Sequence, residues 1–76
     1  MGNNINGFYY AGEVITDMLN EGYELVSIVI NGKRYDGNFI KSIDFLSYVY
    51  IEFEYGTMMF VPYEKIDFIK LREMTE

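Results

Sequence analysis

The sequence predicts a mainly β domain: one N-terminal α-helix, followed by five short antiparallel strands that form a strongly bent small barrel. Three observations support this fold class. Apolar residues recur at helical spacing over residues 9–21. Short apolar segments follow over residues 24–71. Residues that favour tight turns separate these segments, at Asn31-Gly32, Gly37 and Tyr55-Gly56.

The helix is predicted over residues 9–21, with its apolar side chains on one face and Glu13 and Asp17 on the other. Gly22 provides the stop, because glycine adopts the left-handed conformation that ends many helices. Residues 1–8 lack a periodic pattern. They are expected to form a flexible arm or a helix lead-in, with Asn6 as a candidate cap.

The first two strands are predicted to form a hairpin. Residues 25–30 are apolar and nearly continuous, which is typical of a strand covered on both faces. Asn31-Gly32 fits a type I′ turn, in which both central residues need positive φ. Residues 33–41 therefore return along the first strand. Gly37 within this segment predicts a bulge or sharp bend that curls the sheet.

Three further strands complete the predicted sheet. Residues 42–44 are expected to form a tight connection, and residues 48–55 then alternate between apolar and polar side chains. The next glycine turns the chain into a strand over residues 57–61. The interior of this sheet is predicted to contain Val49, Ile51 and Phe53.

The last strand is predicted over residues 66–71. Pro62 cannot donate a ladder hydrogen bond, so it ends the preceding strand or marks a sheet edge. Residues 72–76 are expected to form a charged tail. The single domain is therefore placed at residues 9–71.

Composition restricts the function. Twelve acidic residues against six basic ones give a net charge of −6, which argues against a protein that coats nucleic acid by bulk electrostatics. Histidine and cysteine are both absent, which removes the commonest general base, the thiol nucleophile and the best zinc ligands. No enzymatic activity, metal or cofactor is predicted. The apolar runs are too short to span a bilayer and no secretory signal is recognised, so a cytoplasmic protein without a membrane partner is expected.

The segment INGKRYDGNFIKSID, residues 30–44, resembles the first motif of a known family. It contains a turn glycine, a second glycine five residues later and an aspartate near a loop, at Gly32, Gly37 and Asp44. With the helix and five strands, this pattern resembles the Sm-like family, which includes the bacterial Hfq RNA chaperones. The interval from Gly37 to Asp44 is one residue longer than in the family, which a bulge would absorb.

The resemblance implies a homomeric ring of about five to seven subunits, in which the fourth strand of one subunit pairs with the fifth strand of the next. The candidate interface residues are Met58, Phe60, Ile66, Phe68 and Ile69. The resemblance also implies binding of single-stranded RNA or DNA near the ring opening, where flat side chains can stack on bases. The candidate residues for that site are Asp44, Phe45, Tyr48, Tyr63 and Lys65.

The family's ligand-binding residues are largely replaced in this chain. Leu46 stands where the family often has a base-stacking residue, and Tyr48 stands where it has asparagine. Residues 62–65 replace its Arg-Gly or Lys-His pair. Two functions remain open: a ring that binds single-stranded nucleic acid in RNA or DNA processing or regulation, or an oligomeric protein-interaction scaffold. The structural alternative for Asp44 is a backbone hydrogen bond, and for each aromatic candidate it is packing in the core or interface.

Overall fold

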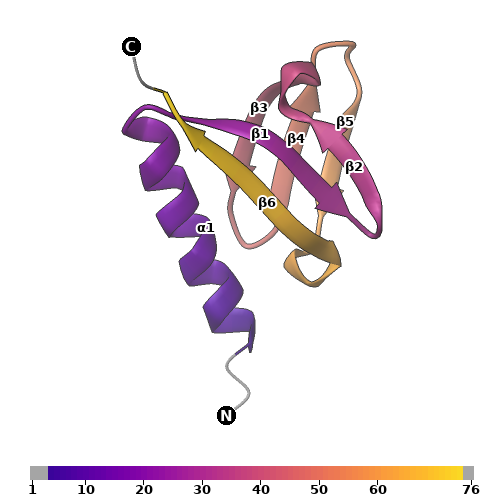
Figure 1. Cartoon of the computed structure of the whole chain (residues 1–76). Helices are drawn as coiled ribbons and strands as arrows, with labels where there is room; N and C mark the ends of the chain where they lie inside the picture. The colour runs from indigo at the N-terminus through magenta and orange to yellow at the C-terminus, as the bar shows by residue number, and fades with distance from the viewer. Residues whose placement is uncertain (1–3, 75–76) are drawn as a thin grey trace.

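The computed structural model describes residues 4–74. Among these residues the chain has one helix and six strands, arranged as two three-stranded sheets (Figure 1). The helix and strands are α1 (Asn4–Asn20), β1 (Tyr23–Ile30), β2 (Lys33–Asp36), β3 (Ile40–Phe45), β4 (Val49–Phe53), β5 (Met58–Val61) and β6 (Ile66–Glu73). Two single turns of 3₁₀-helix connect strands: η1 (Gly37–Phe39) and η2 (Tyr63–Lys65).

The predicted mainly β class with an N-terminal helix is confirmed, but the single five-stranded barrel is not. One antiparallel sheet has the order β2-β1-β6 and the other has the order β3-β4-β5, and neither closes on itself. The strand predicted over residues 33–41 is divided at η1 into β2 and the start of β3. This division gives six strands in the described chain instead of five.

The predicted second strand is interrupted at Gly37, a position where no side chain fits. A Cβ atom on Gly37 would lie 1.9 Å from the carbonyl oxygen of Leu25 in β1. The chain passes close over β1 at this point and continues into the second sheet (Figure 1). The sharp bend predicted at Gly37 is therefore confirmed. Its physical reason is close approach to another strand, since Gly37 does not have positive φ.

The tight connection predicted at residues 42–44 is wrong. These residues lie within β3, where Ile43 pairs with Ile51 and Asp44 with Tyr50. The turn follows later, over residues 46–48, where the Leu46 N–H donates a hydrogen bond to the Tyr48 carbonyl group at 2.8 Å. The chain already changes direction at η1, before β3 begins. Residues 42–44 can therefore continue as an extended strand.

Both predicted glycine turns are present. Asn31 has φ 53° and Gly32 has φ 84°, as a type I′ turn requires. Gly56 has φ 93°. Its N–H donates to the Phe53 carbonyl group at 3.0 Å, and the Phe53 N–H donates to the Thr57 carbonyl group at 2.8 Å. These bonds form a hairpin with a bulge at Gly56, which fixes the register of β4 against β5.

The ends of the first and last elements differ from the predicted bounds. Helix α1 begins at Asn4, so residues 4–8 are helical and Asn6 lies inside the helix instead of capping it. The apolar spacing used to place the helix begins at residue 9, so it gave a start that was five residues too late. Strand β6 extends to Glu73, which pairs with Tyr23. The expected arm at residues 1–3 and the tail at residues 75–76 lie outside the described residues.

The core lies between the two sheets. The residues that share this buried position are Ile28, Ile30, Val49, Ile51, Phe53 and Val61. The interior positions predicted on β4 are thus confirmed. The ring of Tyr35 on β2 lies 5.6 Å from that of Phe53 between centroids, so an aromatic contact joins the two sheets. Among the described residues, no helix is both long and apolar enough to cross a membrane.

Candidate interaction surfaces

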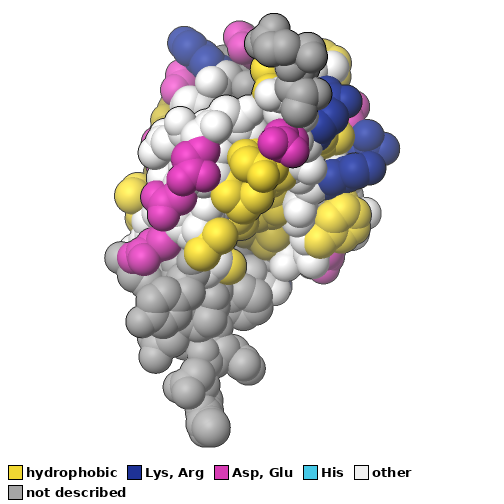
Figure 2. Space-filling view, turned by 60° about the vertical axis from the view of Figure 1, so that its left-hand side comes forward, with side chains coloured by type: hydrophobic (Ala, Val, Ile, Leu, Met, Phe, Trp, Pro, Cys, Tyr) yellow, Lys and Arg dark blue, Asp and Glu magenta, His cyan; other side chains and the backbone are white. Residues whose placement is uncertain are grey.

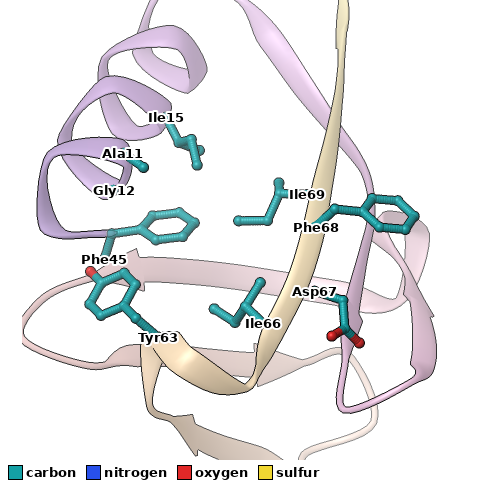
Figure 3. Close-up of a pocket in the computed structure, with 9 residues that line it drawn as sticks. All are labelled: Ala11, Gly12, Ile15, Phe45, Tyr63, Ile66, Asp67, Phe68 and Ile69. Carbon is teal, nitrogen blue, oxygen red and sulfur yellow. The ribbon is translucent and has the colours of Figure 1, made fainter. Parts of the chain in front are cut away.

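An apolar groove of about 220 Å³ lies between α1 and β6 (Figure 3). Ile66 and Ile69 point from the strand side toward the helix, whereas Phe68 points away from it. The lining residues are Ala11, Gly12, Ile15, Phe45, Tyr63, Ile66, Asp67, Phe68 and Ile69. Figure 2 shows hydrophobic side chains across the face of the molecule on the helix side, with acidic side chains to their left and basic ones to their right.

Gly12 brings the helix close to two of the residues predicted to bind nucleic acid. It is buried, and a Cβ atom there would lie 2.9 Å from the Tyr63 hydroxyl group and 3.0 Å from the Phe45 Cβ atom. The Tyr63 hydroxyl donates a hydrogen bond to the Leu46 carbonyl group. Both aromatic side chains are half-buried. Phe45 and Tyr63 therefore support the helix and the turn after β3, which is the packing role left open for them by the sequence.

The other three nucleic-acid candidates, Asp44, Tyr48 and Lys65, are exposed. Asp44 lies on β3 opposite Tyr50, and Tyr48 lies just before β4. Lys65 lies in η2, where its carbonyl group accepts a hydrogen bond from the Asn31 N–H at 2.8 Å. The structure thus joins Phe45 with Tyr63 below the helix and leaves Asp44 and Tyr48 on the opposite side of the second sheet.

The five interface candidates also divide into two groups. Met58 and Phe60 on β5 and Phe68 on β6 are large apolar side chains with 54%, 64% and 56% of their surface exposed. Ile66 and Ile69 are half-buried and pack against the core. Only the first group is presented for contact with another molecule.

The exposed side of the sheet β3-β4-β5 carries a cluster that we call the aromatic face: Tyr48, Tyr50, Met58 and Phe60. The ring of Phe60 lies 5.0 Å from that of Tyr50 and 5.6 Å from that of Tyr48, between centroids, with tilted planes. The Tyr50 hydroxyl donates to the Met58 Sδ atom at 3.1 Å. Contacts through Phe60 and Tyr50 thus link the four side chains, of which Tyr50 is half-buried and the other three are exposed.

Two carboxylates adjoin the aromatic face. Asp44 pairs with Tyr50, and Glu52 pairs with Met58, so both carboxylates share that side of the sheet because directly paired residues point the same way. The Nζ atom of Lys41 lies 3.9 Å from a Glu52 carboxylate oxygen. The Lys41 side chain is largely exposed and the contact is long, so the pair neutralises the half-buried Glu52 only weakly.

Tyr50 is the member of this cluster that sequence reasoning did not single out. Alternation along β4 already predicted that it points outward, but no local pattern shows which residue of β5 stands opposite it. The bulge at Gly56 decides this register and places Phe60 beside Tyr50. The sequence named Tyr48 and Phe60, but assigned them to two different sites.

Among residues 4–74, no group of three or more Asp and Glu side chains is placed to hold a metal ion. Comparison with protein-family models, with curated proteins and with solved structures gave no match. Membership of the Sm-like family therefore stays a proposal.

Proposed function

We propose that this protein is an oligomeric protein-interaction module: an open barrel of the Sm-like type that assembles with copies of itself. The observation that carries the proposal is the pair of unpaired strand edges with exposed apolar side chains. Among the described residues, β5 pairs only with β4, and β6 pairs only with β1. A free edge that carries large apolar residues tends to pair with another chain.

Assembly through β5 of one copy and β6 of the next would join two different surfaces. Such a head-to-tail contact generates a ring when the rotation between subunits closes. Met58 and Phe60 would lie beside β6 of the neighbouring molecule, and their outer face would stay open because strands that pair at an edge extend the sheet sideways. The contact would cover apolar surface that a chain of 76 residues cannot bury alone.

The register of the β4–β5 hairpin shows which backbone groups are free for this pairing. The hydrogen bond from Phe53 to Thr57 is followed by alternating non-bonded and bonded pairs in an antiparallel ladder. Met58 and Phe60 therefore occupy the non-bonded positions, opposite Glu52 and Tyr50. Their N–H and carbonyl groups point away from β4, toward the free edge.

Replacement of Met58 by proline tests the proposal. Of the backbone hydrogen-bonding groups, proline removes only the outward N–H, so the ladder with β4 is retained and edge pairing loses a hydrogen bond. The side chain of Met58, with the Sδ atom that accepts from Tyr50, is lost in this variant and in the leucine control alike. We expect sedimentation velocity to show an oligomer for the original chain and a smaller species for Met58→Pro. The matched control Met58→Leu keeps the N–H group and should keep the original mass. An original chain that sediments as a monomer at all concentrations would refute the proposal.

Single-stranded nucleic-acid binding is a second candidate function, favoured by the exposed rings of Tyr48 and Phe60, on which bases could stack. Fluorescence anisotropy with oligo-U, oligo-A and single-stranded DNA at low salt tests it. Binding that weakens with salt would support this candidate. A pull-down before and after nuclease treatment separates the two functions, because a directly bound protein partner survives the loss of nucleic acid.

A further inference from the structure

The aromatic face combines aromatic and acidic groups in a regular arrangement. Its two cross-strand rows run from β3 through β4 to β5, and their members are Asp44, Tyr50 and Phe60 in one row and Ser42, Glu52 and Met58 in the other. The carboxylates lie on the edge strand β3 and the central strand β4, and the most exposed apolar groups lie on the opposite edge strand, β5. None of the six positions carries a positive charge.

The apolar part of this face is exposed and held in place. Phe60 is 64% exposed, although its ring contacts two tyrosine rings at angles of 44° and 49°. Tyr50 is fixed further by its hydrogen bond to Met58. Aromatic side chains that are held by one another lose little conformational entropy when they bind a partner. The face is therefore preorganised for contact.

Charge identifies the partner. A guanidinium group stacks on aromatic rings and also forms paired hydrogen bonds with a carboxylate, so arginine matches both parts of this face. Asp44 and Glu52 would repel a phosphate backbone. The net charge of −6 adds a long-range attraction for a cationic molecule.

We propose that the aromatic face binds an arginine-rich segment of a protein partner. The inference rests on the proposed role as a protein-interaction module and names the chemistry of the partner. The guanidinium groups lie over Phe60 and Tyr50, and they are paired with Asp44 and Glu52. Lys41 is displaced from Glu52 when an arginine binds, because the bidentate pair is stronger than a single ammonium contact at 3.9 Å.

The test is a titration of the full chain with a short capped peptide in which arginine alternates with glycine, followed by NMR. We expect saturable chemical-shift changes at Tyr48, Tyr50 and Phe60, and an affinity that falls as salt is added. The same peptide with citrulline in place of arginine keeps the shape but loses the charge, and should bind at least about fivefold more weakly. Equal binding of the citrulline peptide would overturn the inference.

Two pairs of variants locate the site. Phe60→Ala should weaken peptide binding about five- to tenfold, whereas Phe39→Ala, which removes another exposed ring in η1, should leave it unchanged. Glu52→Gln should weaken it about threefold, whereas Glu64→Gln in η2 should not. If a control variant loses peptide binding and the matching variant on the aromatic face does not, the site lies elsewhere and the inference is overturned.

Oligo-U titrated into the chain without the peptide separates the two macromolecular classes. Saturable chemical-shift changes at Tyr48, Tyr50 and Phe60 on addition of oligo-U would assign the face to nucleic acid and overturn the inference, and unchanged shifts support it. The mass of each sample, measured by sedimentation, distinguishes the two proposals. If the chain is a monomer and binds the peptide, only the self-association proposal is refuted. If the chain is an oligomer and does not bind the peptide, only the arginine-binding proposal is refuted.

Discussion

Gly37 lies so close to the backbone of Leu25 that a Cβ atom at this position would come within 1.9 Å of the Leu25 carbonyl oxygen and 3.2 Å of the Val26 carbonyl oxygen. These neighbours are backbone atoms of β1, so they cannot rotate away as a side chain could. The contact holds η1 against β1 and sets the path from the first sheet to the second.

Gly37→Ala should therefore destabilise the fold by about 3 kcal/mol, because the backbone of η1 or of β1 must move to admit the methyl group. Urea unfolding followed by circular dichroism measures the change in the free energy of unfolding. Asn38→Ala is the control, since Asn38 is exposed in the same turn. If the two variants unfold at the same urea concentration, the close approach at Gly37 does not limit stability.

Local chemistry explains which parts of this fold could be predicted. Positive φ at Asn31 and Gly32 is a property of the turn itself, and the inward positions of β4 follow from alternation along a single strand. The division of the second strand could not be placed in the same way. It depends on the close approach of Gly37 to Leu25, which arises only when the two arms of the β1–β2 hairpin have come together.

The candidate sites depended even more on tertiary contacts. A half-buried Phe45 and an exposed Tyr48 look alike in the sequence, since both are aromatic residues beside a turn. Gly12 of the helix decides the difference, because it packs against Phe45 and Tyr63. Pairing of β4 with β5 then brings Phe60 beside Tyr50 and creates the aromatic face.

Tyr63→Phe should lower the free energy of unfolding by about 1 kcal/mol, because it removes the hydroxyl group that donates to the Leu46 carbonyl group and keeps the ring. Tyr63→Ala should cost at least about 2 kcal/mol more, since the ring itself packs beneath the helix at Gly12. Thermal unfolding of both variants measures these losses. A Tyr63→Ala chain as stable as the original would return Tyr63 to the set of residues available for ligand stacking.

Phe53→Ala should remove a large part of the free energy of unfolding. Phe53 is 2% exposed and contacts the other sheet through Tyr35, and truncation of a buried phenylalanine costs about 3–5 kcal/mol. A domain of this length has a total stability of about 4–11 kcal/mol. Tyr55→Ala is the control, because its ring stacks on Phe53 from an exposed position. The prediction fails if both variants show the same loss in a urea titration.

Asp67 fixes the β1–β2 turn from the last strand, because its Oδ2 atom accepts a hydrogen bond from the Gly32 N–H at 2.7 Å. Asp67→Ala removes this acceptor and should lower the free energy of unfolding. The loss should be only about 1 kcal/mol, because water can bind the exposed N–H group instead. Amide hydrogen exchange gives the more specific readout: Gly32 should exchange faster in Asp67→Ala, with the amides of the core strand β4 unchanged. Asp67→Asn retains a carbonyl oxygen as acceptor and should restore part of the protection. Equal exchange at Gly32 in the original chain and in Asp67→Ala would show that the turn is held by its own backbone conformation alone.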